Sequence, residues 1–92
     1  MQDMIARIAD VIAENCDVER GDITADANVI SDLGVDSLDF LDISFAIEKQ
    51  FNVKLPVDEW VEKVDGNEAA LDDFFTVKAI AAYVRQHSAA AA

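Results

Sequence analysis

The chain has 92 residues, with 19 Asp or Glu against 7 Lys or Arg, and therefore a net charge of -12. Because 52% of the residues are hydrophobic, the composition predicts one compact domain over residues 1–92 and excludes a disordered acidic tail. So acidic a surface repels nucleic acid and anionic membranes, and it favours a partner protein with a basic face. The single cysteine, Cys16, excludes an internal disulfide and a cysteine-rich zinc site, and we interpret it as an inert thiol that is buried or half-buried.

Apolar residues at helical spacing predict an amphipathic first helix over about residues 3–15. Its apolar side consists of Met4, Ile5, Ile8, Val11 and Ile12. The first twenty residues mix charged and apolar side chains, which is typical neither of a signal peptide nor of a membrane span. The default location is therefore the cytoplasm.

From Cys16 to Asp36 the helical period is lost, and turn-forming residues predict a long loop without regular structure. Four apolar residues would anchor this loop to the core: Ile23, Val29, Ile30 and Leu33. A structureless loop of this length is usually functional or disordered, and the anchors favour a functional loop.

The helical period resumes over residues 37–51, where two apolar rows predict a second helix. One row is Leu38, Leu41 and Phe45, and the other is Phe40, Ile43, Ile47 and Phe51. Asn52 tolerates the left-handed conformation that ends a helix, and Pro56 disfavours a helical residue before it. The helix should therefore end at Phe51.

After Pro56, a short amphipathic helix is predicted from the spacing of Val57, Trp60, Val61 and Val64, and it should stop at residues 65–67. One or two further turns are predicted around Leu71, Phe74 and Phe75. Thr76 is a suitable cap for a last helix, and the tail over residues 88–92 should be frayed. No segment alternates with period two, so we predict an all-α bundle of three main helices and one or more short ones.

Ser37 begins the second helix, where a serine is usually only a cap. A serine hydrolase needs a nearby base, but the only histidine, His87, lies close to the C-terminus, and the elbow pattern G-x-S-x-G is absent. Residues 65–73 lack the ligand spacing of an EF-hand, and the chain has little room for a sugar cleft. We therefore expect neither a serine hydrolase nor a glycosidase, and no EF-hand metal site.

Residues 32–56, DLGVDSLDFLDISFAIEKQFNVKLP, resemble the acyl carrier proteins, whose signature is a D-S-L triplet that opens an acidic second helix. ITADANVI upstream and TVKAIAAYV in the last helix extend the resemblance over most of the chain. The resemblance implies a four-helix bundle and a carrier that holds acyl groups as thioesters on a 4'-phosphopantetheine arm at Ser37. A helix N-terminus suits the phosphodiester, because free N–H groups and the helix dipole favour an anion there.

The resemblance also implies roles for neighbouring residues. Asp36 would assist the metal-dependent step of a phosphopantetheinyl transferase. Basic patches on that transferase, on chain-elongating enzymes and on acyltransferases would dock against Leu38, Asp39, Asp42 and Glu48. An acyl pocket would be lined by Leu33, Ile43, Ile47, Phe51, Val77, Ile80 and Ala81, although ordinary core packing demands the same side chains. A monomer without membrane insertion is expected.

The chain also departs from the common carrier pattern. The segment between Pro56 and Thr76 is longer than usual and includes Trp60, Leu71, Phe74 and Phe75. In the second helix the unusual residues are Phe40, Ser44, Phe45 and Lys49. This combination is similar to the bacterial carriers of very long hydroxylated acyl chains for lipid A, and the longer segment would either widen the acyl pocket or complete a small core.

Two alternatives remain open at the level of sequence. A peptidyl or polyketide carrier would share the Ser37 chemistry with a different cargo, although the strong acidity and the lack of flanking linkers favour a free-standing fatty acyl carrier. An acidic interaction module would leave Ser37 unmodified.

Overall fold

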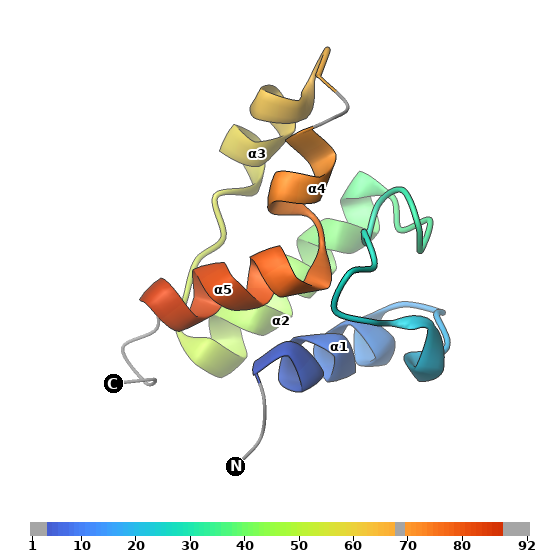
Figure 1. Cartoon of the computed structure of the whole chain (residues 1–92). Helices are drawn as coiled ribbons and strands as arrows, with labels where there is room; N and C mark the ends of the chain where they lie inside the picture. The colour runs from blue at the N-terminus through green and yellow to red at the C-terminus, as the bar shows by residue number, and fades with distance from the viewer. Residues whose placement is uncertain (1–3, 68–69, 88–92) are drawn as a thin grey trace.

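The computed structural model describes residues 4–67 and 70–87, with Ser37 described by its backbone alone. Within these ranges the helices are α1 (Met4–Asn15), the 3-10 turn η1 (Arg20–Asp22), α2 (Ser37–Phe51), α3 (Val57–Val64), α4 (Leu71–Phe74) and α5 (Val77–His87) (Figure 1). The described residues form no strand, and their only β-bridge joins Asn28 to Thr76. The predicted all-α fold is confirmed, with α4 as the additional short helix.

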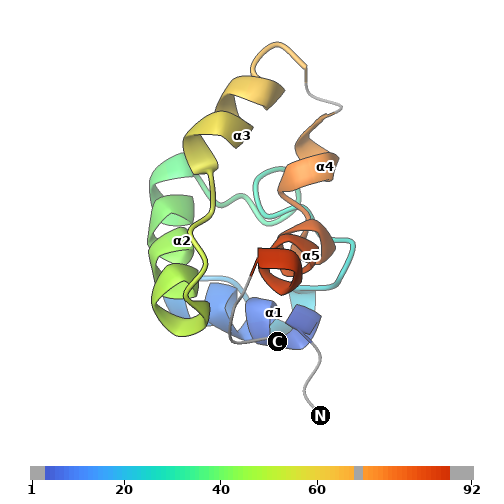
Figure 2. The same ribbon diagram turned by 90° about the vertical axis from the view of Figure 1, so that its left-hand side faces the viewer.

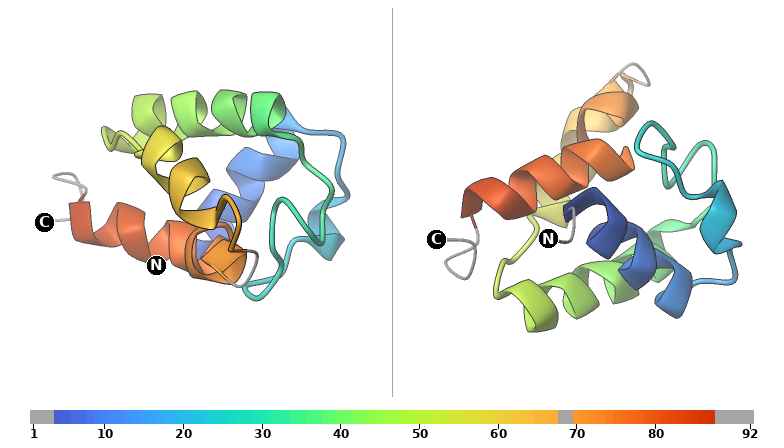
Figure 3. Two further views of the ribbon diagram at one scale, coloured as in Figure 1. Left: turned by 90° about the horizontal axis from the view of Figure 1, so that it is seen from above. Right: turned by 60° about the horizontal axis from the view of Figure 1, so that its bottom comes forward.

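The helices form a lower group of three long helices and an upper pair of short helices. α1 packs against both α2 and α5, while α3 and α4 stand together above them (Figures 1 and 2). Seen from above, α3 runs from the C-terminal end of α2 toward α4 (Figure 3). The segment that is longer than in common carriers therefore builds the upper part of the molecule.

One continuous apolar core joins the three long helices. Its fully buried members include Ile8, Val11, Ile12, Ile43, Ile47, Val77, Ile80 and Val84. The predicted loop anchors reach this core, since Ile23 and Val29 are buried and Ile30 and Leu33 are half-buried. Of the two apolar rows on α2, only the row that begins at Phe40 is buried, whereas Leu38 and Phe45 remain 73% and 62% exposed.

Local sequence signals account for the ends of the helices. Asn52 follows α2 in the left-handed region at φ 58°, and its N–H donates to Glu48 O at 2.8 Å. Gly66, at φ +77°, reverses the chain after α3. Thr76 caps α5 as predicted, because its Oγ1 accepts a 3.3 Å hydrogen bond from Ala79 N–H.

The long loop is more regular than predicted. Arg20–Asp22 forms a 3-10 turn, so the expectation of no regular structure between Cys16 and Asp36 is wrong at this point. The turn is held against α1, since Arg20 Nε lies 2.7 Å from Asp10 Oδ1. Residue 3 of the predicted first helix and the predicted frayed tail fall outside the described residues.

Candidate functional site at the start of α2

A tight turn sets the position at which α2 begins. Gly34 adopts φ +72°, a conformation that a residue with a Cβ rarely accepts, and Val35 is buried behind it. Asp36 is extended, and its Oδ1 accepts a 2.8 Å hydrogen bond from Asp39 N–H. Asp36 is therefore the helix cap, and Ser37 is the first helical residue. The cap role that the sequence allowed for Ser37 belongs to its neighbour.

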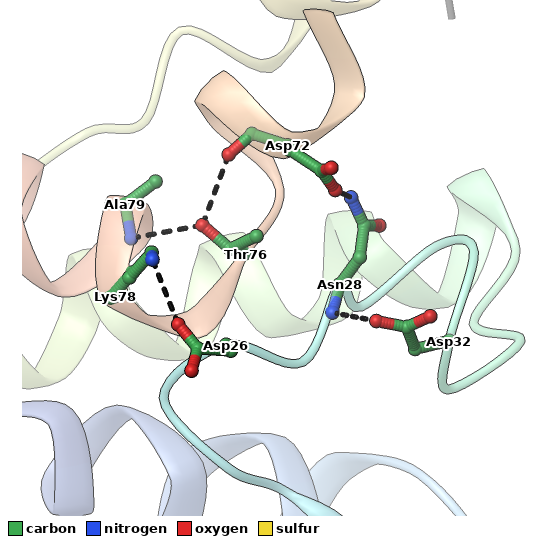
Figure 4. A network of polar contacts seen from close by, with 7 residues as sticks. All are labelled: Asp26, Asn28, Asp32, Asp72, Thr76, Lys78 and Ala79. Carbon is green, nitrogen blue, oxygen red and sulfur yellow. Dashed lines mark hydrogen bonds and ion pairs between the residues drawn. The ribbon is translucent and has the colours of Figure 1, made fainter. Parts of the chain in front are cut away.

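Asn28 organises the loop that leads to this turn. Its side chain is fully buried, and its Oδ1 accepts hydrogen bonds from the N–H groups of Ile30 at 2.9 Å and Ser31 at 3.0 Å. Its own N–H donates to Asp32 Oδ2 at 2.8 Å, and its Nδ2 donates to Asp72 Oδ1 at 3.0 Å (Figure 4). One buried amide thus shapes the loop and attaches it to α4.

The same loop is also joined to the start of α5. Val77 N–H donates to Ala27 O at 3.0 Å, and Lys78 Nζ donates to Asp26 Oδ1 at 2.8 Å (Figure 4). The hydrogen bond and charge of Lys78 lower the pKa of Asp26 below its ordinary value. The loop is therefore fixed at both α4 and α5 before it reaches Ser37.

The outer side of α2 combines acids with exposed apolar residues. All four residues predicted to dock partners are exposed there: Leu38, Asp39, Asp42 and Glu48. A groove of about 360 Å³ lies between α2 and the start of α3, and Glu48 is the one residue of these four that lines it, together with Phe45. Ser44 is buried at this groove and donates to Leu41 O at 2.7 Å, which satisfies the unusual hydroxyl.

Cys16 lies close enough to α2 for the acidic residues of that helix to affect the pKa of its thiol. Burial of the thiol raises the pKa of Cys16, and the carboxylates of Asp39, Asp42 and Asp36 raise it further. The cysteine is half-buried, as predicted. These effects disfavour the thiolate, which is the reactive form of cysteine.

An apolar cavity of about 230 Å³ opens beside the start of α2. The loop and α2 contribute Ile30, Val35, Asp36 and Phe40 to its walls. The upper part of the molecule contributes Val61, Val64, Leu71 and Phe75. Asp36 is the only charged residue in this lining, and it directly precedes Ser37.

The residues predicted to line an acyl pocket lie elsewhere. Six of them are at most 2% exposed and fill the core between α2 and α5: Ile43, Ile47, Phe51, Val77, Ile80 and Ala81. Leu33 is half-buried and borders a different hollow, together with Asp17 and Val18. None of the seven is part of the cavity lining beside Asp36.

Sequence reasoning named several of the lining residues but did not bring them together as one cavity. Phe40, Leu71 and Phe75 stood out as departures from the common carrier pattern. Val61 and Val64 were taken only as the apolar side of α3, because the helical period does not reveal what that side faces.

The described residues contain no group of three His, Cys, Asp or Glu side chains arranged to hold a metal ion. His87 lies at the exposed end of α5, where its ring stacks on Tyr83 at 4.1 Å between centroids. Among the helices that the structure describes, none is long and apolar enough to cross a membrane.

The comparisons with known proteins agree with this geometry. The family described as "Phosphopantetheine attachment site" matches residues 6–84. Acyl carrier protein AcpXL of Rhizobium etli is 41% identical over 86 residues, covering 94% of this chain and 94% of that protein. The AcpXL of Brucella melitensis is 39% identical over 90 residues, or 98% and 97% of the two chains. An acyl carrier protein of Guillardia theta is 35% identical over 71 residues, which cover 77% of this chain and 86% of that protein.

These matches span the loop, the start of α2 and the last helix. Proteins of this family interact with a phosphopantetheinyl transferase and with acyl-handling enzymes. The chain therefore belongs to the acyl carrier proteins: it is a carrier of acyl groups on a 4'-phosphopantetheine arm and not an enzyme.

Proposed function

We propose that Ser37 is the residue to which the arm is attached. The observation that carries this proposal is the position of Ser37 as the first residue of α2, directly behind the Asp36 cap and beside the apolar cavity. When attached, the arm supplies a terminal thiol that holds acyl groups as thioesters. The chain itself contributes the helix end, the rigid loop and the cavity.

The start of α2 fits a phosphodiester. The first N–H groups of a helix have no intrahelical acceptor, and the dipole places partial positive charge there. The Asp36 carboxylate accepts a hydrogen bond from the N–H of Asp39 only, so the N–H groups that precede Asp39 in the first turn remain available to the phosphate. The exposed carboxylates of Asp36 and Asp39 repel the same phosphate, and this repulsion favours an arm that is presented outward rather than folded against the helix.

Asp36 has a second role in this proposal. Its Oδ1 is occupied by the cap, and its other carboxylate oxygen would assist the divalent metal step of the transferase. The acyl chain, once loaded, would enter the cavity whose lining includes Asp36 and Phe40. Both roles follow from the same placement of Asp36 between the arm and the cavity.

The exposed side of α2 would serve as the docking surface for partner enzymes. Asp39, Asp42 and Glu48 offer charge to Lys and Arg, and the protruding Leu38 and Phe45 offer apolar contact. Charge-steered docking of this kind is fast and sensitive to salt. We place this exchange of partners in the cytoplasm, with the carrier as a monomer.

We further propose that the cargo is a very long hydroxylated acyl chain for lipid A. The support is the longer α3–α4 segment, together with near full-length matches to proteins named AcpXL. The mass of the acyl group on carrier purified from the cells that naturally produce it tests this cargo. Carrier loaded only with common short or medium fatty acids would contradict it.

Incubation with coenzyme A and a broad phosphopantetheinyl transferase, followed by intact mass measurement, tests the attachment site. We expect the mass of one phosphopantetheine to be added to the native chain and none to Ser37→Ala. Ser31→Ala is the matched control, because this exposed loop serine precedes the turn. No mass increase in the native chain, or an increase that survives Ser37→Ala, would reject the proposal.

A further inference from the structure

Two aromatic rings separate the cavity beside Asp36 from the core of the bundle. Phe40 and Phe75 both line the cavity, and their ring centroids lie 5.1 Å apart in an edge-to-face arrangement at 73°. They are only 1% and 2% exposed. The next buried hydrophobic residues along each segment, Ile43 and Val77, belong to the core and not to the cavity lining.

Phe75 is held in place by contacts with α3 and with the long loop. Phe75 also packs edge-to-face on Trp60, with centroids 5.8 Å apart at 87°. Its carbonyl oxygen accepts a 2.9 Å hydrogen bond from Val29 N–H, which ties the same residue to the loop. A side chain packed on both sides and fixed through its backbone cannot move aside without disturbing the core.

We infer that Phe40 and Phe75 form the closed end of the cavity and set the length of acyl chain that this domain shelters. The inference rests on the proposed function and deepens it by limiting the cargo that can be enclosed. The cavity is open to solvent on one side, so a volume of about 230 Å³, at about 30 Å³ for each group of methylene size, holds at most about eight such groups. The distal part of a very long chain then lies outside the cavity.

The depth limit gives the longer α3–α4 segment a defined role. Leu71 and Phe75 complete the cavity wall, and Phe75 also forms its floor. The segment therefore adds a side wall and a floor without opening the core between α2 and α5, whose residues remain packed. A partner enzyme would have to receive the part of the cargo that the carrier leaves outside.

Methyl NMR on a series of loaded carriers tests this inference. Butanoyl, octanoyl, dodecanoyl and hexadecanoyl chains are attached to the arm, and the methyl shifts of Val35, Val61 and Leu71 are followed. We expect these shifts to grow from butanoyl to octanoyl and then to stop changing, while the methyls of Ile43 and Ile80 do not move. Continued change up to hexadecanoyl, or movement of the core methyls, would overturn the inference.

Substitution of Phe40 should change the acyl chain length at which the methyl shifts stop changing. Phe40→Ala removes a ring, on the order of 100 Å³ or about three more groups of methylene size, and shifts the plateau from octanoyl to dodecanoyl. Phe74→Ala is the matched control, since that ring stacks on Trp60 at 5.8 Å without lining this cavity. Should Phe40→Ala fail to fold, Phe40→Leu and the native series still decide the question. A plateau that shifts equally in Phe74→Ala would contradict a floor formed by Phe40.

The unmodified chain provides an arm-independent test. Free n-alkanols of increasing length, titrated into the protein, should shift the same cavity methyls, with no further change beyond octanol. Failure of the arm to attach to Ser37 would reject the proposed function, whereas alkanols that shift the core methyls would reject the floor. The two failures are therefore distinguishable.

Discussion

Asn28 Nδ2 donates a 3.0 Å hydrogen bond to Asp72 Oδ1 and so joins the loop before Ser37 to α4, across 44 positions of sequence. The same two segments both line the cavity, through Val35 on the loop and Leu71 on α4. This one side-chain pair therefore holds the approach to Ser37 and the wall of the cavity in a fixed relation.

Asn28→Ala should lower the free energy of unfolding by about 2–3 kcal/mol. It removes three hydrogen bonds made by a fully buried side chain, each worth about 0.5–1.5 kcal/mol. Asp72→Ala removes only one of these bonds, and water can replace the carboxylate because Asp72 is exposed, so this variant should cost about 0.5–1.5 kcal/mol. Urea unfolding of both variants measures the difference. Equal losses would mean that the loop depends on the link to α4 and not on the internal bonds of Asn28.

The role of Asn28 shows where sequence reasoning stops. Asn52 and Thr76 were predicted as helix-terminal residues, because their signals depend only on neighbours a few positions away. Asn28 has the same chemistry, but its burial depends on α4, which follows it by more than forty residues. In a segment rich in turn residues, nothing marks one amide as the buried one.

The cavity was missed for a related reason. The helical period placed Phe40 in one of two apolar rows on α2 and placed Val61 and Val64 on one side of α3, but it did not say which row of α2 is buried. What those sides face depends on the position of α3 relative to α4 and the loop, which no period within a single helix contains. The family resemblance placed the acyl pocket among core residues such as Ile43 and Ile80, which are fully buried in the structure. That placement stays a prediction.

Two variants of Asp36 separate its cap role from its charge. Asp36→Asn keeps a side-chain oxygen for Asp39 N–H and should change the free energy of unfolding by only a few tenths of a kcal/mol, whereas Asp36→Ala should lower it by about 1 kcal/mol. Attachment of the arm by the transferase should slow about tenfold in both variants, because both remove the carboxylate that would serve the metal step. Urea unfolding and timed intact-mass measurements give the two quantities.

Asp22→Asn serves as the control for the loss of one negative charge, since Asp22 is an exposed acid in η1. Its attachment rate should match that of the native chain. If Asp36→Asn were loaded at the native rate while Asp36→Ala was slow, the cap alone would explain the effect, and the metal role would be rejected.

The raised pKa of Cys16 predicts slow alkylation and a specific alkaline instability. Less thiolate is present at a given pH than in the urea-unfolded chain, so iodoacetamide should react more slowly with the folded protein. Because the folded pKa exceeds the unfolded pKa, the contribution of Cys16 to stability is complete below the unfolded pKa and is lost as pH rises through the folded pKa. Cys16→Ala should therefore lose less stability than the native chain on the alkaline side.

The carboxylates near Cys16 provide the control for this prediction. Asp39→Asn combined with Asp42→Asn should move the alkylation profile of the folded protein part of the way back toward that of the unfolded chain, since burial remains the larger cause of the raised pKa. A native profile identical to the unfolded one would show that the thiol is fully solvated in solution, contrary to its half-buried position.

Phe45 and Glu48 should contribute to partner docking in ways that salt distinguishes. Phe45 is 62% exposed, so Phe45→Ser should change the free energy of unfolding by less than about 0.5 kcal/mol. It should nevertheless raise the KM of the phosphopantetheinyl transferase about tenfold, the size expected for a lost apolar anchor of about 1–2 kcal/mol.

Glu48→Gln should raise KM at low salt, and this effect should fade at high salt as the Debye length shrinks from about 8 Å at 0.15 M to about 3 Å at 1 M. Gln50→Ser, an exposed polar change in the last turn of α2, is the control and should leave KM unchanged. A Phe45 effect that fades with salt as the Glu48 effect does, or that Gln50→Ser reproduces, would argue against an apolar anchor on this surface.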